Sequence, residues 1–287
     1  MSMTFQRGGI HPPEYKLTAT NPIEQMPIPK KLLIPVIQHI GAPANPIVQN
    51  GDSVKKGQII AEASSYVSSN IHASTSGVVE AIDRMLHPSG QYTLGIIINP
   101  DGKDEWQEGL NIKTENYLGL SKEELLNKIK FAGVVGMGGA GFPSHVKLSP
   151  PADKPIDTII LNGAECEPFL TADHRLMLEH TEELIEGLKI IHAICNKKPQ
   201  VFIGIEENKH DAVEKFKAYT KNTEFKVVEL PTKYPQGDER QLINAITKRR
   251  MREGQLPFDV GCLVHNAGTV FAIYEAVAYN KPLIERV

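Results

Sequence analysis

From residue 156 onward, short apolar segments alternate with helical segments, and this alternation restricts the second half of the chain to few folds. Repeated strand–helix units are typical of a mainly parallel sheet with helices on its faces, a Rossmann-like α/β sandwich. Ligands of such sheets bind beyond the carboxyl ends of the strands. The predicted strands are residues 156–161, 201–205, 225–230 and 260–264, and the predicted helices are 176–194, 209–219, 239–247 and 270–278.

Residues 31–100 predict a separate all-β domain, because short apolar stretches alternate with turn signals there. The turn at 51–58 and the segment 71–79 resemble the barrel-sandwich hybrid of lipoyl and biotinyl carrier domains. Those carriers need an attachment lysine at a hairpin tip, but the tip region at 61–70 contains none. We therefore expect a structural or docking role. The expected strands are 32–37, 47–48, 58–61, 77–82 and 94–98.

His72 lies in this β domain, and two roles are open to it. It could be a ligand, but a lone histidine in a strand is more often simply hydrogen-bonded, and we expect the second role.

A glycine-rich run occupies residues 133–147. Glycine tolerates positive φ and has no side chain to hold a ligand away, so such a loop can present several backbone N–H groups to a phosphate. Lys147 could add a positive charge. The run is not a Walker A motif, and it is a poor dinucleotide fingerprint because the residues before it predict a helix, with a capping box at 121–124. The alternative interpretation is a tight turn between packed elements.

Size and composition narrow the class of protein. A chain of 287 residues predicts two domains. A net charge of −3 without a dense basic cluster argues against nucleic acid as a partner. No apolar run reaches the roughly 20 residues that a membrane span needs. The three cysteines form no Cys-x-x-Cys pair, so the sequence shows neither a zinc nor an iron–sulfur site.

The domain boundaries follow from these patterns. Residues 1–30 are rich in proline and predict an extended arm that packs on another part of the protein. The remaining segments are the hybrid domain at 31–100, a linker at 101–120, the α/β domain at 121–278 and the start of a further segment at 279–287.

Polar residues follow each predicted strand of the α/β domain, where binding is expected. Phosphate donors in the glycine run and hydroxyl acceptors at the strand ends suit a nucleotide or a flavin. Phe142 offers a face for a planar ring. The alternative for any one of these loops is a capped helix start, for which Asp238 or Thr269 would serve.

Two motifs together resemble the flavin site of the NADH-oxidising flavoprotein subunit of respiratory complex I. They are the run 136–147 and the segment 162–168, which reads Asn-x-x-Glu-x-Glu-Pro. With the N-terminal stretch 8–13 and the stretch 39–43 in the hybrid domain, the chain resembles more closely the RnfC family. RnfC is the peripheral, NADH-facing subunit of the Rnf ion-pumping ferredoxin:NAD oxidoreductase. The resemblance covers essentially the whole chain.

The resemblance implies FMN and NAD(H) as cofactors and a role for each motif. The glycine loop with Lys147 would hold the FMN phosphate, and Phe142 would stack on a ring of NADH. Further residues would line flavin or dinucleotide, with Asp238 standing where the complex I subunit has glutamate. The implied cofactor-binding residues are Gly136, Gly138, Gly139, Ala140, Gly141, Phe142, Lys147, Asn162, Glu165, Glu167, Tyr234, Gly237, Asp238, Glu239, Asn266 and Thr269. No catalytic acid or base and no metal ligand is expected.

The resemblance also implies a setting. The family continues into a β-grasp-like segment and two cysteine-rich [4Fe-4S] motifs, so we expect a fragment that exchanges hydride with NADH but lacks its own clusters. Its partners would be the other subunits of a membrane electron transport complex and an iron–sulfur carrier on the ferredoxin side. Its place would be peripheral, on the cytoplasmic side of the cell membrane. Two alternatives stay open: an RnfC-like cobalamin reductase, and a non-catalytic docking subunit with a vestigial flavin site.

Overall fold

The computed structural model describes residues 4–5, 8–195 and 198–287. The chain divides into two compact units, each described here by itself. Unit 1 comprises Met1–Glu24, Leu148–Tyr274 and Val287, and unit 2 comprises Gln25–Lys147 and Glu275–Arg286.

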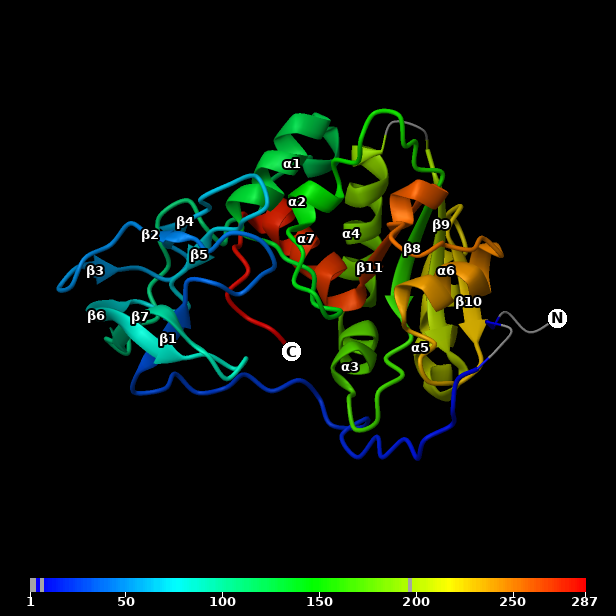
Figure 1. Ribbon diagram of the computed structural model, residues 1–287, viewed down its shortest axis with the longest axis horizontal. Helices are drawn as coiled ribbons and strands as arrows, with labels where there is room; N and C mark the ends of the chain where they lie inside the picture. The colour runs from blue at the N-terminus through cyan, green and yellow to red at the C-terminus, as the bar shows by residue number, and fades with distance from the viewer. Residues whose placement is uncertain (1–3, 6–7, 196–197) are drawn as a thin grey trace. The chain divides into compact units, whose positions relative to one another are not determined.

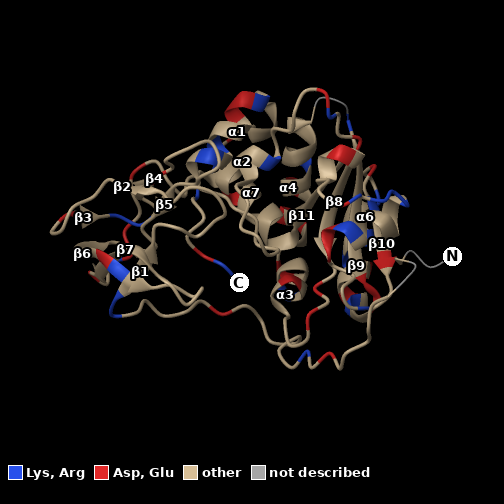
Figure 2. Ribbon diagram, viewed as in Figure 1, with Lys and Arg blue, Asp and Glu red and all other residues tan. Residues whose placement is uncertain are grey.

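Unit 1 is built around one parallel sheet, with the strand order β10-β9-β8-β11 (Figure 1). The two central strands, β8 and β9, carry no charged residue before the final Glu206, so their surroundings are apolar (Figure 2). The elements are β8 (Thr158–Gly163), α3 (Ala172–Glu179), α4 (Thr181–Ile194), β9 (Gln200–Glu206), η2 (Glu207–Lys209), α5 (His210–Thr220), β10 (Lys226–Leu230), α6 (Glu239–Thr247), η3 (Pro257–Val260), β11 (Cys262–Asn266) and most of α7 (Ala267–Tyr279).

Helices cover both faces of this sheet, as the alternation of strands and helices predicts. Successive residues of a strand point to opposite faces. Ile160 on β8 therefore packs with Leu242 and Ile246 of α6 on one face. On the other face, a side chain at Gly163 would meet Met177 of α3 at 2.5 Å, so the absence of a side chain lets helix and strand approach closely. The predicted α/β sandwich is confirmed.

Unit 2 contains the antiparallel sheets of the hybrid domain, with strand orders β1-β7-β6-β3 and β2-β4-β5. Their buried apolar residues form one core that includes Ile60, Ile96 and Ile98. The elements are β1 (Leu32–Pro35), β2 (Asn45–Pro46), β3 (Ser53–Val54), β4 (Ile59–Glu62), β5 (Ile71–His72), β6 (Gly77–Leu86), β7 (Tyr92–Pro100), η1 (Tyr117–Gly119), α1 (Lys122–Phe131), α2 (Ser144–Lys147) and the end of α7.

Several local predictions can be compared with these bounds. The capping box at the start of α1 is confirmed, because Ser121 and Glu124 bond reciprocally to each other's backbone. The predicted strand at 47–48 is wrong, since the paired residues are Asn45 and Pro46. The predicted helix 176–194 is two helices, because His180 between them has a non-helical backbone, with φ −127° and ψ 39°. Hydrophobic periodicity continues through that break, so it could not reveal it.

Described residues of the N-terminal arm up to Glu24 belong to unit 1, and two of them contact its later segments. Ile10 forms an antiparallel bridge with Tyr234, and the rings of Tyr15 and Phe169 stack with centroids 5.1 Å apart. These contacts involve Ile10 and Tyr15 of the predicted arm, and residues 1–3 and 6–7 of the arm lie outside the described part. Among the described residues, no helix combines the length and apolar character needed to cross a bilayer.

Candidate functional site

The order of the strands in unit 1 creates a natural place for a ligand. From β8 the chain adds β9 and then β10 on one side, whereas β11 lies on the other side of β8. The connections leaving the carboxyl ends of β8 and β11 therefore diverge, which is the position where open α/β sheets bind ligands. Asn162 and Asn266 are partners in register at this point. Both belong to the predicted cofactor-binding set.

The loop after β8 is tied to the loop after β10 by hydrogen bonds. Asn162 donates from Nδ2 to the carbonyl of Gly237 at 2.8 Å and accepts from the backbone N–H of Ala164 at 3.2 Å. The N–H of Gly237 points to Sγ of Cys166 at 3.4 Å. Two loops separated by about 70 residues thus form one wall, and the structure brings together the predicted residues Asn162 and Gly237.

Glu165 occupies a strained and buried position in the same loop. Its φ is 47°, in the left-handed region that favours glycine, and it is 8% exposed. Its carboxylate accepts hydrogen bonds from the backbone N–H groups of Asp173 and His174, at 2.7 and 3.3 Å. This carboxylate therefore anchors the first turn of α3 against the end of β8.

Asp173 joins this arrangement, although the sequence analysis did not select it. Its carboxylate accepts a hydrogen bond of 2.5 Å from Nδ2 of Asn266. Burial, followed by the charge of Glu165, raises the pKa of Asp173 to about 7, against the hydrogen bond from Asn266. Near neutral pH this carboxyl can therefore be protonated or ionised, and it can donate or accept a hydrogen bond. Perturbed carboxyls of this kind cluster at functional sites.

A buried ion pair lies at the carboxyl end of β9. Lys209 and Glu206 are 2% and 0% exposed at their side chains, with Nζ and Oε2 3.5 Å apart. Burial raises the pKa of Glu206 to about 7, and the charge of Lys209 opposes that shift. Lys209 also donates to the carbonyl of Ala164 at 2.6 Å. The pair therefore supports the loop that carries Glu165.

The N-terminal arm holds the same loop from outside. Nζ of Lys16 donates to the carbonyls of Glu165, Glu167 and Leu170 at 2.8, 2.9 and 2.6 Å. Glu14 accepts from the N–H of Phe169 through its carbonyl at 2.9 Å. One ammonium group thus organises a stretch of six residues, 165–170, between β8 and α3.

A cavity of about 160 Å³ lies between the arm and the strand ends of unit 1. Its wall includes the exposed Tyr234, and Cys166 lies beside it with a thiol whose pKa is raised by burial and by Glu167 and Glu206. The thiol is therefore poorly suited to be a nucleophile, as its acidic neighbours predict. The full lining is His11, Pro12, Glu14, Lys16, Cys166, Glu206, Asn208, Thr232, Lys233 and Tyr234.

Asp238 and Thr269 are the residues for which a role as helix N-cap is the alternative to binding. Asp238 precedes α6 and accepts from the N–H of Gln241 at 3.1 Å, so it is an N-cap. Thr269 is not a cap, because it lies inside α7 and its N–H donates to Oδ1 of Asn266 at 3.4 Å. Glu239 begins α6, and Glu167 is exposed.

The glycine loop belongs to unit 2 and follows α1, as predicted from the helical pattern before it. Val135 and Pro143 pair across its base, and the N–H of Gly136 donates to the carbonyl of Phe142 at 2.9 Å. Its tip, Gly138, Gly139 and Ala140, is exposed. Lys147 is the half-buried last residue of α2.

Two glycines of this loop have the conformations for which glycine is required. Gly139 has φ 140° and Gly141 has φ 63°. A side chain at Gly141 would meet the backbone of His39 and Gln38 at 3.2 and 3.3 Å, whereas one at Gly139 would extend into open space. Open space beside exposed backbone leaves room for a ligand such as phosphate, so this geometry is compatible with the predicted role.

The residues of this network that are absent from the predicted binding set are Lys16, Asp173, Glu206 and Lys209. Glu206 and Lys209 follow a predicted strand, so their position at a strand end was a usable signal. Lys16 and Asp173 carried no such signal, because their partners are distant in sequence. Among the described residues, no three histidine, cysteine, aspartate or glutamate side chains gather as a metal site requires.

Comparison with known proteins adds two family matches. Residues 129–275 match the family model described as the Nuo51 FMN-binding domain, and residues 3–103 match the RnfC barrel sandwich hybrid domain. The first match includes both the glycine loop and the strand-end residues. The second confirms the predicted hybrid domain.

Similar curated proteins are subunits of ion-translocating oxidoreductase complexes. The chain is 54% identical over 282 residues to a subunit of the proton-translocating ferredoxin:NAD(+) oxidoreductase complex of Clostridium ljungdahlii, covering 98% of this chain and 61% of that protein. It is 44% identical over 283 residues to the counterpart from the Na(+)-translocating complex of Acetobacterium woodii, covering 98% and 63%. It is 45% identical over 286 residues to the counterpart from the ion-translocating oxidoreductase complex of Rhodobacter capsulatus, covering 98% and 54%. The chain thus spans between 54% and 63% of the length of these relatives.

Among solved structures, a chain of an NAD+-reducing [NiFe]-hydrogenase in the air-oxidised state matches with a TM-score of 0.49 and 21% identity, covering 55% of this chain and 30% of that chain.

Proposed function

The chain belongs to the RnfC family, and from this membership we propose that it is the NADH-oxidising or NAD-reducing flavin module of an Rnf-type electron transport complex. The observation that carries the proposal is the polar network at the strand switch point, within the family-matched FMN-binding domain. There, hydrogen bonds join Glu165, Asp173 and Asn266, and Asn162 is the register partner of Asn266. Whole-complex activity, substrates and partners are part of the proposal.

The donors and acceptors at the strand ends suit FMN chemically. A ribityl chain offers hydroxyls and an isoalloxazine ring offers carbonyls and a ring N–H, which amide and carboxyl side chains can match. Asp173 strengthens this fit, because a carboxyl with a pKa of about 7 can serve as donor or acceptor. We propose that Asn162, Glu165 and Asn266 bind the flavin and that Thr269 completes the pocket.

The remaining residues would take roles that the family resemblance implies. The glycine loop, Gly136, Gly138, Gly139, Ala140 and Gly141, and Lys147 would bind the FMN phosphate. Phe142 would stack on a ring of NADH. The residues proposed to line flavin or dinucleotide are Glu167, Tyr234, Gly237, Asp238 and Glu239.

The cofactor would supply the redox chemistry, since a flavin accepts a hydride from NADH and returns electrons one at a time. The chain itself would bind and orient both molecules and exclude water, and no protein acid or base is required. Electrons would pass to [4Fe-4S] clusters outside residues 1–287, and then to the ferredoxin side of a complex at the cytoplasmic face of the membrane.

The test is a titration of the purified chain with FMN, followed by quenching of flavin fluorescence. We expect saturable binding that Lys147→Ala weakens about tenfold, the effect of losing one charge-assisted contact. Lys113→Ala, an exposed lysine, is the matched control and should bind like the parent chain. NADH added without oxygen should then bleach the bound flavin.

Two outcomes of these experiments would contradict the proposed flavin module. If neither this chain nor a longer one carrying the cysteine motifs binds FMN, the redox proposal is wrong and the docking-subunit alternative takes its place. Reduction by NADH followed by electron transfer to a cobalamin rather than to an iron–sulfur protein would favour the cobalamin reductase.

A further inference from the structure

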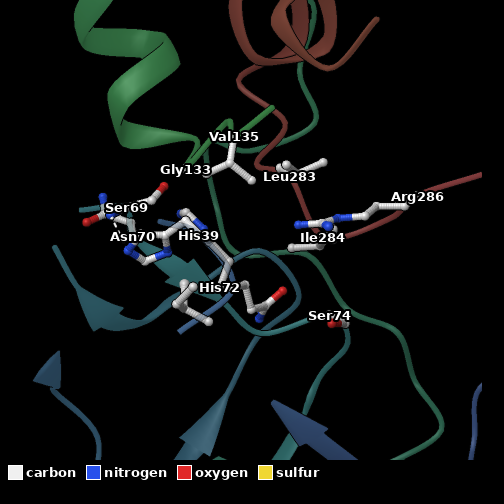
Figure 3. Close-up of a pocket in the computed structure, with 12 residues that line it drawn as sticks. His39, Ser69, Asn70, His72, Ser74, Gly133, Val135, Leu283, Ile284 and Arg286 are labelled. Atoms are coloured by element: carbon white, nitrogen blue, oxygen red, sulfur yellow. Dashed lines mark hydrogen bonds between the residues drawn. The ribbon is translucent and has the colours of Figure 1, made fainter. Parts of the chain in front are cut away.

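Unit 2 contains a polar cavity of about 190 Å³ that the proposed flavin chemistry does not use. Figure 3 shows its walls, which come from the loops of the hybrid domain, from the residues after α1 and from the C-terminal segment. The lining residues are Gln38, His39, Ser69, Asn70, Ile71, His72, Ser74, Gly133, Val135, Leu283, Ile284 and Arg286.

Three side chains of this cavity are buried with unsatisfied polar atoms. His72 is 4% exposed, and neither of its ring nitrogens makes a hydrogen bond within the described residues. Oγ of Ser69, on a residue 2% exposed, and Nδ1 of His39 are also without partners there. A buried polar group left unpaired destabilises the folded state. Because native proteins rarely leave such groups unpaired, three in one cavity point to a ligand.

The expected hydrogen bond of His72 is not found by its geometry among the described residues, and the group near its ring is the backbone of Phe131. Burial lowers the pKa of His72 to about 4, so the ring is neutral at pH 7. A neutral imidazole has one N–H donor and one acceptor nitrogen, so the ring can still donate one hydrogen bond to a ligand.

The charged group that lines the cavity indicates whether a cation or an anion would bind there. No aspartate or glutamate lines the cavity, and Arg286 extends toward it from the C-terminal segment (Figure 3). Among the described residues, Arg286 makes no ion pair. Nε2 of His39 lies 3.1 Å from both the N–H of Ser69 and the carbonyl of Ala42, so Nδ1 is left for a ligand in either tautomer. Arginine and hydroxyl donors without carboxylates disfavour a cation and suit an oxyanion.

We propose that this cavity is a binding site for a phosphate group, held by the guanidinium of Arg286, the hydroxyl of Ser69 and the ring of His72. The three residues line the same cavity and come from segments of unit 2 that are far apart in sequence. Gly133 and Val135 of the glycine-rich run line the cavity, but none of the three proposed phosphate ligands belongs to that run, and the site does not rest on the proposed function.

The test uses inorganic phosphate as the probe and the chain of residues 1–287. Isothermal titration should show one saturable site, and the histidine ring signals of His72 should shift at constant pH in NMR spectra. Arg286→Gln and Ser69→Ala should each weaken phosphate binding at least fivefold. Arg84→Gln, an exposed arginine in β6, is the matched control and should leave binding unchanged. Circular dichroism would establish that the variants are folded.

Four results would overturn the proposal. The first is absence of saturable binding with unmoved His72 signals, and the second is binding that both Arg286→Gln and Ser69→Ala leave intact. The third is phosphate that FMN displaces and Lys147→Ala abolishes, because the anion would then occupy the glycine loop. Binding of acetate without phosphate would also contradict the assignment to a phosphate group.

Discussion

The side-chain amide of Asn266 donates a hydrogen bond of 2.5 Å to the carboxylate of Asp173. This bond joins the end of β11 to the first turn of α3, at the place where the strand order reverses. Glu165 is bonded to the same turn of α3, so its carboxylate lies close to that of Asp173 and raises the pKa of Asp173. The titration of Asp173 follows from this proximity and gives the first prediction.

Asp173 should make the protein less stable as the pH rises from about 4 to 7. Its ordinary pKa is 3.8, and burial raises it to about 7 in the folded protein. In that window the folded state binds more protons than the unfolded state, so the free energy of unfolding falls with increasing pH, by at most about 4 kcal/mol for this group. Urea unfolding at pH 5 and pH 7 measures this change in the free energy of unfolding. In Asp173→Asn the difference between the two pH values should be smaller than in the parent chain.

Asp153→Asn, at an exposed position, is the control and should leave the pH dependence of the free energy of unfolding unchanged. A pH dependence that is the same in Asp173→Asn and the parent chain would show that Asp173 does not carry the effect.

Removing the positive charge of Lys209 from its ion pair with Glu206 should strongly lower the free energy of unfolding. Lys209→Met leaves Glu206 without its partner, and breaking a buried ion pair in this way costs roughly 3–5 kcal/mol. Because the pKa of Glu206 should then rise further, the loss should be larger at pH 8 than at pH 6. Urea unfolding at both pH values measures it.

The double variant Lys209→Met/Glu206→Gln should recover part of that loss, since no charge is then left buried. If the two single effects simply add in this cycle, Lys209 and Glu206 are not coupled and the ion-pair explanation fails.

Lys16 should control the order of the loop 165–170. Lys16→Met removes three hydrogen bonds to the carbonyls of Glu165, Glu167 and Leu170. Hydrogen exchange of the amides in this loop should become faster, while the loss in global stability stays near 1–2 kcal/mol because the site is only half-buried. Lys113→Met is the control. Equal exchange rates in both variants would show that the hydrogen bonds of Lys16 do not order the loop 165–170.

The two ends of the glycine loop should respond differently to the same added methyl group. Gly141→Ala should cost about 1–3 kcal/mol, because φ is 63° and the new Cβ would lie 3.2 Å from Cα of His39. Gly136→Ala places its Cβ at an ordinary 3.6 Å from Phe142 and should change stability by less than about 1 kcal/mol. Thermal unfolding of both variants is the measurement, and a reversed order would mean that the loop has another conformation.

The sequence predicted the classes of both domains because periodicity reports local burial. Alternating strands and helices after residue 156 indicated the parallel sheet, and turn-separated apolar stretches indicated the hybrid domain. The joint motifs indicated the family, which the family matches and the relatives support. The break at His180 was missed because hydrophobic periodicity runs through both helices.

The sequence by itself therefore determined the elements, their faces and the motif-bearing loops, all of which depend on neighbours within a few residues. Only the tertiary structure decided which distant groups meet: Lys16 with the loop after β8, Asp173 with Asn266, and Lys209 with Ala164. It also decided that His72 is buried without a hydrogen bond among the described residues. Burial and charge proximity are properties of folded neighbours, so the pKa values of Asp173, Glu206 and His72 could not be inferred before the chain was folded.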